Sequence, residues 1–170
     1  MALPPTPEGV GFRAVNAMKQ NSPKDIATNK RAFFDYEILD TLEVGLVLTG
    51  TEVKSLRNHG GNIQEGYIKI LGGEAWLVGA SIAPYTFGNL YNHEERRDRK
   101  LLLHKRELLK LKEQTKEKGL SVVPISLYFK KGVVKLKIGV GRGKKVRDKR
   151  STLIEKEKKR EVDRAMKGER

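Results

Sequence analysis

The sequence has no cysteine, no long apolar run, and too few acidic residues to balance its basic ones. Without cysteine, a disulfide framework and a thiolate metal site are excluded, and a reducing cytoplasm is the fitting compartment. No segment approaches the roughly 18 consecutive apolar residues of a membrane-spanning helix. Thirty-five Lys and Arg against 21 Asp and Glu give a formal charge of +14, which favours a polyanionic partner. A basic ribosomal or nucleic-acid-binding protein is therefore the leading class, ahead of one that binds an anionic membrane surface.

Catalytic motifs are also scarce. The sequence has no glycine-rich phosphate loop and no nucleophile elbow. Its three histidines lack the spacing of a metal site, and we expect them to be solvated or to face RNA. Glu52-Val53-Lys54, downstream of Asp35 or Asp40, resembles half of a Mg²⁺-dependent nuclease site, but that chemistry needs Glu and Lys on one side of a strand. We therefore expect no enzymatic activity, no metal and no cofactor, and keep the nuclease as the enzyme alternative.

Both ends of the chain differ in composition from its middle. Residues 1–28 hold four of the six prolines and no sustained apolar period, which predicts a disordered N-terminal extension, with an organellar transit peptide as the alternative. Residues 142–170 hold 13 Lys and Arg and six acids, which is half of the net charge. This basic C-terminal tail has too few apolar residues to fold alone, yet it is rich in helix formers. We expect it to be disordered when free and helical on a partner.

The middle, residues 29–141, reads as one domain of short strands and helices. Strands are predicted at 33–48, with a bend at 43–45, and at 81–85; hairpins at 67–71 with 74–78 and at 122–129 with 133–140; helices at 50–58 and 101–118. Most neighbouring strands are joined by tight turns, which disfavours parallel winding. A mainly β fold, closed or nearly closed into a small antiparallel barrel, removes the exposed edges of so small a sheet.

The stretch 46–57 is the point around which the domain is organised. Thr49, followed three residues later by Glu52, predicts a capping box that starts a short helix directly after a buried strand. Val53 and Leu56 should face inward, while Lys54 and Arg57 should point together elsewhere. A strand that delivers a short basic helix can hold cations rigidly for contact with phosphate.

Basic residues gather in three clusters: Lys54 with Arg57, residues 96–106, and residues 142–150. Few aromatic residues are interleaved with them, which argues against a surface that stacks on single-stranded bases. Structured RNA, recognised by its shape, phosphates and 2′-hydroxyls, suits such a protein better.

Four blocks of sequence carry a resemblance to a known family: residues 29–32, 46–57, 99–107 and 143–150. In order and content they resemble the small protein B (SmpB) family, the SsrA-binding proteins of bacteria. The resemblance implies an OB-like barrel with about three flanking helices, acting as a cytoplasmic monomer. It also implies binding to the tRNA-like domain of tmRNA and delivery of that RNA to stalled ribosomes for trans-translation. The barrel is then expected to complete the missing anticodon arm, and the tail to enter the empty mRNA channel near the decoding centre.

The resemblance also implies which residues meet each partner. Those expected to contact RNA are Asn29, Lys30, Glu43, Glu52, Lys54, Arg57, Lys100 and Leu102, although Leu102 also fits a core position. Those expected to contact the ribosome are Gly143, Lys144, Lys145, Asp148, Lys149, Arg150, Ile154 and Met166. Arg147 departs from the Tyr or His usual in the family, and the N-terminal extension is longer than usual. The binding alternative is an rRNA-binding ribosomal protein or assembly factor.

Overall fold

A computed structural model of the chain describes residues 25–168. The N-terminal extension predicted over 1–28 lies outside the described residues except for its last four. These four form strand β1 (Asp25–Thr28), which pairs with β8 (Leu120–Lys130). The structured domain therefore begins earlier than the sequence suggested, because a partner strand that lies about a hundred residues away completes the pairing.

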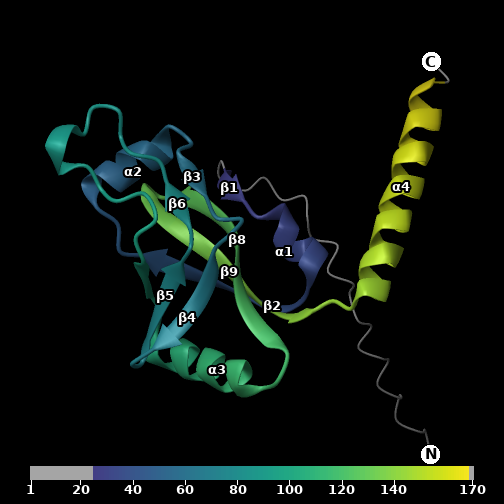
Figure 1. The fold of residues 1–170 in the computed structure, drawn as a ribbon, viewed down its shortest axis with the longest axis horizontal. Helices are drawn as coiled ribbons and strands as arrows, with labels where there is room; N and C mark the ends of the chain where they lie inside the picture. The colour runs from purple at the N-terminus through teal and green to yellow at the C-terminus, as the bar shows by residue number, and fades with distance from the viewer. Residues whose placement is uncertain (1–24, 169–170) are drawn as a thin grey trace, which may run out of the picture.

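Seven strands form one antiparallel sheet in the order β1-β8-β9-β2-β7-β5-β4. The others are β9 (Val133–Gly143), β2 (Tyr36–Leu46), β7 (Arg99–Leu102), β5 (Glu74–Val78) and β4 (Tyr67–Leu71). A second, two-stranded sheet joins β3 (Gly61–Asn62) to β6 (Ser81–Ile82). The sheet curls on itself, as Figure 1 shows, and β4 lies against β8. Among residues 25–168 no backbone ladder joins these two strands, so the predicted closed barrel is not confirmed: the fold is a curled antiparallel sheet with helices.

The two predicted hairpins are confirmed. β4 and β5 meet through Gly72 and Gly73, whose positive φ values of 60° and 78° suit a two-residue turn. β8 and β9 meet through Lys131 and Gly132, also at positive φ. In β9 the alternating residues Val134, Leu136, Ile138 and Val140 are buried as predicted. They belong to a single core that also includes Leu56, Ile63, Leu77 and Leu127.

Three local predictions are wrong. The strand predicted from Phe33 begins only at Tyr36, because α1 (Lys30–Asp35) precedes it. The irregularity in β2 falls between Ile38 and Asp40, and residues 43–45 pair regularly. The predicted helix over 101–118 begins only at Lys105 as α3 (Lys105–Lys116), since Arg99–Leu102 pairs with β2 and β5 as strand β7.

The helices are placed around the sheet as Figure 1 shows. α2 (Gly50–Arg57) lies at one end and α3 at the other, and β7 directly precedes α3 in the chain. The loop between β6 and β7 carries a short 3₁₀ helix, η1 (Asn89–Tyr91), and projects beside α2. Helix α4 (Val146–Gly168) follows β9 and extends away from the sheet. The tail is therefore helical over Val146–Gly168, and its disorder when free and its folding on a partner both stay predictions.

Candidate RNA interface

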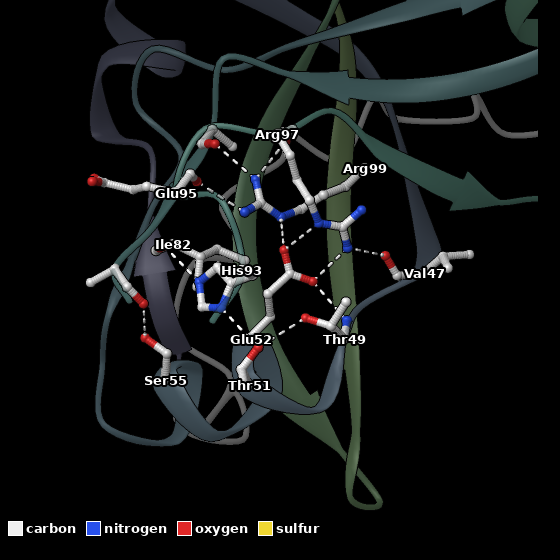
Figure 2. A network of polar contacts seen from close by, with 12 residues as sticks. Val47, Thr49, Thr51, Glu52, Ser55, Ile82, His93, Glu95, Arg97 and Arg99 are labelled. Atoms are coloured by element: carbon white, nitrogen blue, oxygen red, sulfur yellow. Dashed lines mark hydrogen bonds and ion pairs between the residues drawn. The ribbon is translucent and has the colours of Figure 1, made fainter. Parts of the chain in front are cut away.

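Helix α2 begins on a buried glutamate. The predicted capping box is present, and Glu52 Oε2 accepts a hydrogen bond of 2.7 Å from the backbone N–H of Thr49. The same carboxylate accepts hydrogen bonds from Arg97 at 2.6 and 2.8 Å and from Arg99 Nε at 2.8 Å (Figure 2). Glu52 and Arg99 are both 0% exposed. One carboxylate thus starts the helix and pairs with two guanidinium groups.

The network fixes the loop between β6 and β7, residues 83–98. Arg99 donates to the carbonyls of Ala80, Arg97 and Glu95 at 2.9 to 3.0 Å. The ring nitrogens of His93 lie 3.0 Å from Thr51 Oγ1 and from the carbonyl of Ile82 (Figure 2). The ring of His93 is therefore used inside the fold, in contrast to the solvated or RNA-facing histidine that we expected.

The charge state of Glu52 follows from these contacts. Burial acts to raise the pKa of Glu52, but the hydrogen bonds from Arg97 and the Thr49 N–H, with the charges of Arg99 and Arg97, hold it below its usual range. Glu52 is thus a carboxylate whose oxygens are already bound. It is not available to hold Mg²⁺ or an RNA group, which removes the geometric basis of the nuclease alternative and corrects the predicted contact of Glu52 with RNA. Across residues 25–168, no cluster of three or more His, Asp or Glu suits a metal ion.

The cations of α2 are presented on the opposite side from its buried face. Lys54 and Arg57 are exposed, whereas Glu52, Ser55 and Leu56 are buried. Val53 is only half-buried, so Leu56 carries most of the predicted inward face. The Lys54 ammonium lies 5.6 Å from the ring centroid of Tyr85, a cation–π distance. Both cations remain accessible to phosphate, as the sequence predicted.

Three of the predicted RNA-contacting residues line one groove of about 580 Å³ at the α3 end of the sheet: Glu43, Lys100 and Leu102. Lys100 pairs with Glu74, across the groove lining. Leu102 packs against Gly45 on the neighbouring strand but is still 53% exposed. It therefore presents an apolar surface and is not a core leucine. The groove combines charged groups with an exposed aliphatic side chain.

Glu43 is held in place at the groove by two donors. Its carboxylate accepts hydrogen bonds from the Tyr128 hydroxyl and from Lys130 Nζ, the latter at 2.9 Å. The Tyr128 hydrogen bond and the Lys130 charge hold the pKa of Glu43 below its usual range. Burial, together with the Glu43 hydrogen bond and charge, raises the pKa of Tyr128. Glu43 is therefore an oriented, ionised acceptor at the surface.

Asn29 has a different position from the one predicted. It is the N-cap of α1, accepts a hydrogen bond of 3.0 Å from the N–H of Ala32, and donates to the carbonyls of Pro124 and Ile63 at 3.0 and 3.4 Å. The residue is buried, so its amide is used inside the fold and direct contact with RNA is not supported. Its neighbour Lys30 is exposed and remains free to meet phosphate.

The base of the tail is attached to α1. The N–H of Lys144 donates to the carbonyl of Asp35 at 2.9 Å, and Lys144 Nζ donates to the carbonyl of Phe33 at 3.1 Å. Lys149 Nζ pairs with Asp35 at 2.7 Å and lies 5.8 Å from the Phe34 ring. Gly143 is the last residue of β9. The other residues predicted to contact the ribosome have exposed side chains: Lys145, Asp148, Arg150, Ile154 and Met166. The side chain of Arg147 lies outside the described part.

Sequence reasoning missed Arg97 and Arg99 as members of the Glu52 network. Both had been counted only among the cations of the cluster 96–106. It also missed the loop tip, where Phe87, Leu90 and Tyr91 are exposed. The spacing of Arg97 and Arg99, two apart and just before three leucines, was the available signal, because extended residues two apart point to the same side.

Comparisons with known proteins find a matching family model and similar relatives. A family model described as "SmpB protein" matches residues 26–168. "SsrA-binding protein" of Chlamydia trachomatis serovar A is 60% identical over 144 residues, covering 85% of this chain and 95% of the relative. That of Chlamydia caviae is 57% identical over 146 residues, with 86% and 97% covered, and that of Staphylococcus aureus strain JH1 is 52% identical over 149 residues, with 88% and 97% covered.

One solved structure is also similar. It is described as "tmRNA-SmpB: a journey to the center of the bacterial ribosome", is 46% identical to this chain, and has a TM-score of 0.60. The match covers 70% of this chain and 84% of the other. In the described residues 25–168, none of the helices is long and apolar enough to cross a membrane.

Proposed function

The chain belongs to the SmpB family, and from that premise we propose that it binds tmRNA and delivers it to stalled ribosomes for trans-translation. The observation that carries the proposal is identity of 52–60% to SsrA-binding proteins over most of both chains. The partners are tmRNA and the ribosome, in the cytoplasm where ribosomes translate. The chain acts as a binding factor, with no catalytic step assigned to it.

Two surfaces meet the RNA in this proposal. At one end, exposed Lys54 and Arg57 neutralise phosphates of the tRNA-like domain. At the other end, the groove places Glu43 to accept hydrogen bonds from 2′-hydroxyls or base edges, while Leu102 covers an apolar part of a nucleotide. On binding, Lys100 leaves its ion pair with Glu74 and contacts a phosphate. The curled sheet between the two ends serves as an OB-like platform, supported by the approach of β4 to β8.

Asn29 and Glu52 contribute to this interface indirectly. Asn29 fixes the start of α1, close to exposed Lys30. Glu52 fixes the start of α2, and with it Lys54 and Arg57. Substitution of either buried residue weakens RNA binding by displacing the exposed cations that follow it.

The tail is assigned to the ribosome. Its exposed cations Lys145 and Arg150 are free to contact phosphate, and α4 exposes Ile154 and Met166 along its length. By family resemblance, the domain replaces the anticodon arm and the tail occupies the empty mRNA channel. The chain acts as a monomer in this arrangement.

The proposal is tested with the purified full-length chain. Binding is measured to the transcribed tRNA-like domain of tmRNA and, as a control, to a structured rRNA fragment of equal length, at the same salt concentration. We expect clear preference for the tRNA-like domain and restoration of peptide tagging on stalled ribosomes that lack their own factor. Equal affinity for both RNAs, with no tagging, would instead support the rRNA-binding alternative.

A further inference from the structure

The loop between β6 and β7 exposes large apolar side chains at its tip. Phe87 is 78% exposed, Leu90 is 98% exposed and Tyr91 is 90% exposed. Single exposed apolar residues are common on protein surfaces, but three within five residues form a patch that marks an interaction site. The proposed contacts with tmRNA at α2 and at the groove do not use this patch.

The tip is presented by a loop with many internal hydrogen bonds. Asn92 Oδ1 accepts from the backbone N–H groups of Tyr85 and His93 at 3.1 Å, and Asn92 Nδ2 donates to the carbonyl of Tyr85 at 2.8 Å. The N–H of Gly88 donates to the same carbonyl at 2.9 Å. Tyr85 and Phe87 meet edge to face with centroids 5.7 Å apart. The backbone on either side of the exposed rings is therefore held by a polar framework.

The base of this loop is joined to the basic helix α2. Ser55 Oγ donates to the carbonyl of Ala83 at 2.5 Å, and His93 reaches Thr51. Lys54 sits over the Tyr85 ring. Figure 1 shows η1 and α2 projecting from the same end of the molecule. Proteins that bind unpaired bases combine aromatic side chains, which stack on the bases, with nearby cations, which bind the phosphates of the RNA backbone.

We propose that Phe87 and Tyr91 stack on unpaired bases of the RNA whose backbone Lys54 and Arg57 neutralise. This inference rests on the proposed function and adds a base-stacking subsite to it. It revises the expectation that the surface does not stack on bases, which came from the few aromatic residues interleaved with the cations in the sequence. In the structure, the loop that carries the rings is joined to the helix that carries Lys54 and Arg57. Leu90, which lies between them in the sequence and is 98% exposed, adds apolar surface to the same loop tip.

The inference is tested by binding the transcribed tRNA-like domain to wild type, Phe87→Ala and Tyr91→Ala across a salt titration. Since stacking on an aromatic side chain contributes about 1–3 kcal/mol per base, each variant should weaken binding roughly 5- to 150-fold. The slope of log affinity against log salt should not change, because no phosphate contact is removed. Phe87→Trp should restore affinity, and ultraviolet crosslinking should join the wild-type loop to unpaired nucleotides.

Leu39→Ala is the matched control, since Leu39 is also exposed, at 55%, but lies on β2. It should bind as wild type does. Unchanged affinity for the tRNA-like domain in both ring variants overturns the inference. If affinity is unchanged but tagging on ribosomes falls, the inference is also overturned, because the tip then contacts a ribosomal component. A wild type that binds the rRNA control as well as the tRNA-like domain instead refutes the proposed function, and the stacking assignment with it.

Discussion

Replacing Glu52 by glutamine separates the charge of the buried network from its shape. The glutamine carbonyl can still accept the hydrogen bond from the Thr49 N–H, since Gln serves at this position of a capping box. What is lost is the negative charge that faces Arg97 and Arg99. With the carbonyl in the Oε2 position, the glutamine NH₂ group takes the position of Oε1 and points a donor at the Nε–H groups of both Arg97 and Arg99.

The size of the effect follows from burial. Arg99 is 0% exposed and cannot turn to water when its partner is neutralised. Removing one member of a buried ion pair costs about 3–5 kcal/mol, against roughly 0–1 kcal/mol for an exposed pair. We therefore expect Glu52→Gln to lower the free energy of unfolding by about 3–5 kcal/mol, and Glu52→Ala to lose about 1 kcal/mol more with the cap. The capping box alone predicts only the smaller term.

The assay is urea unfolding followed by the fluorescence of Trp76, the single tryptophan. Glu65→Gln is the control, because Glu65 pairs with Arg96 at 3.5 Å with both side chains about two-thirds exposed. That variant should stay within about 1 kcal/mol of wild type. A loss below about 1 kcal/mol in Glu52→Gln would show that the pair does not need its charge, and would refute the reasoning.

The pH dependence gives an independent check. The folded pKa of Glu52 lies below its unfolded value, so its contribution is present above the unfolded pKa, near 4.5, and is lost as pH falls from there through the folded pKa. The pKa values of Asp35, Asp40 and Glu43 are also lowered, so protonation of these three side chains destabilises the wild type in the same acid range. The difference between wild type and Glu52→Gln isolates Glu52: it should shrink as pH falls below 4.5.

The remaining predictions concern the two partners. Lys54→Ala and Arg57→Ala should each weaken tmRNA binding and flatten its salt dependence by about one counterion, and an unchanged slope removes that residue from the interface. Truncation after residue 145 should leave folding and tmRNA affinity nearly intact but abolish tagging. Lys158→Pro should have the same effect as the truncation, because proline costs the helix ~3 kcal/mol. Normal tagging by the proline variant refutes a helical tail. Asp35→Asn should leave tmRNA affinity unchanged but raise backbone mobility in the first turns of α4 by NMR relaxation, and equal relaxation excludes the ion pair as an anchor.

The parts of the fold that the sequence predicted are those set by neighbouring residues. The capping box at Thr49 and Glu52, the diglycine turn at 72–73 and the alternation of β9 each depend on residues a few positions apart. The predicted start of α3 was wrong because Leu101 and Leu102 continue the leucine stripe of the helix. Pairing of residues 99–102 with β2 and β5 overrides that local preference, and His104 with Glu107 provides the actual helix start.

The candidate site was predicted in part for the same reason. Lys54, Arg57 and Leu102 are exposed, which is compatible with the contacts that the family motifs imply, and the contacts themselves stay predictions. Glu52 was recognised as a capping residue, but its burial could not be seen, because Arg99 lies 47 positions along the chain and no local pattern links the two. Residue type alone does not distinguish a carboxylate that meets RNA from one that anchors the helix beside it.

The attachment of α4 links the RNA-binding domain to the tail. A helix with so few buried side chains gains little from packing, and helices without packing are marginal in water. Its first turn, however, is fixed to α1 by the pair of Lys149 with Asp35, and the residue Lys144 just before the helix also bonds to α1. Those two lysines are thereby engaged within the protein, whereas exposed Lys145 and Arg150 are free for ribosomal phosphate. The basic junction thus divides into two lysines that fix the direction in which α4 leaves the domain and cations that stay exposed. Because the domain itself holds the base of α4, an RNA bound to the domain meets the tail at an angle that the protein sets.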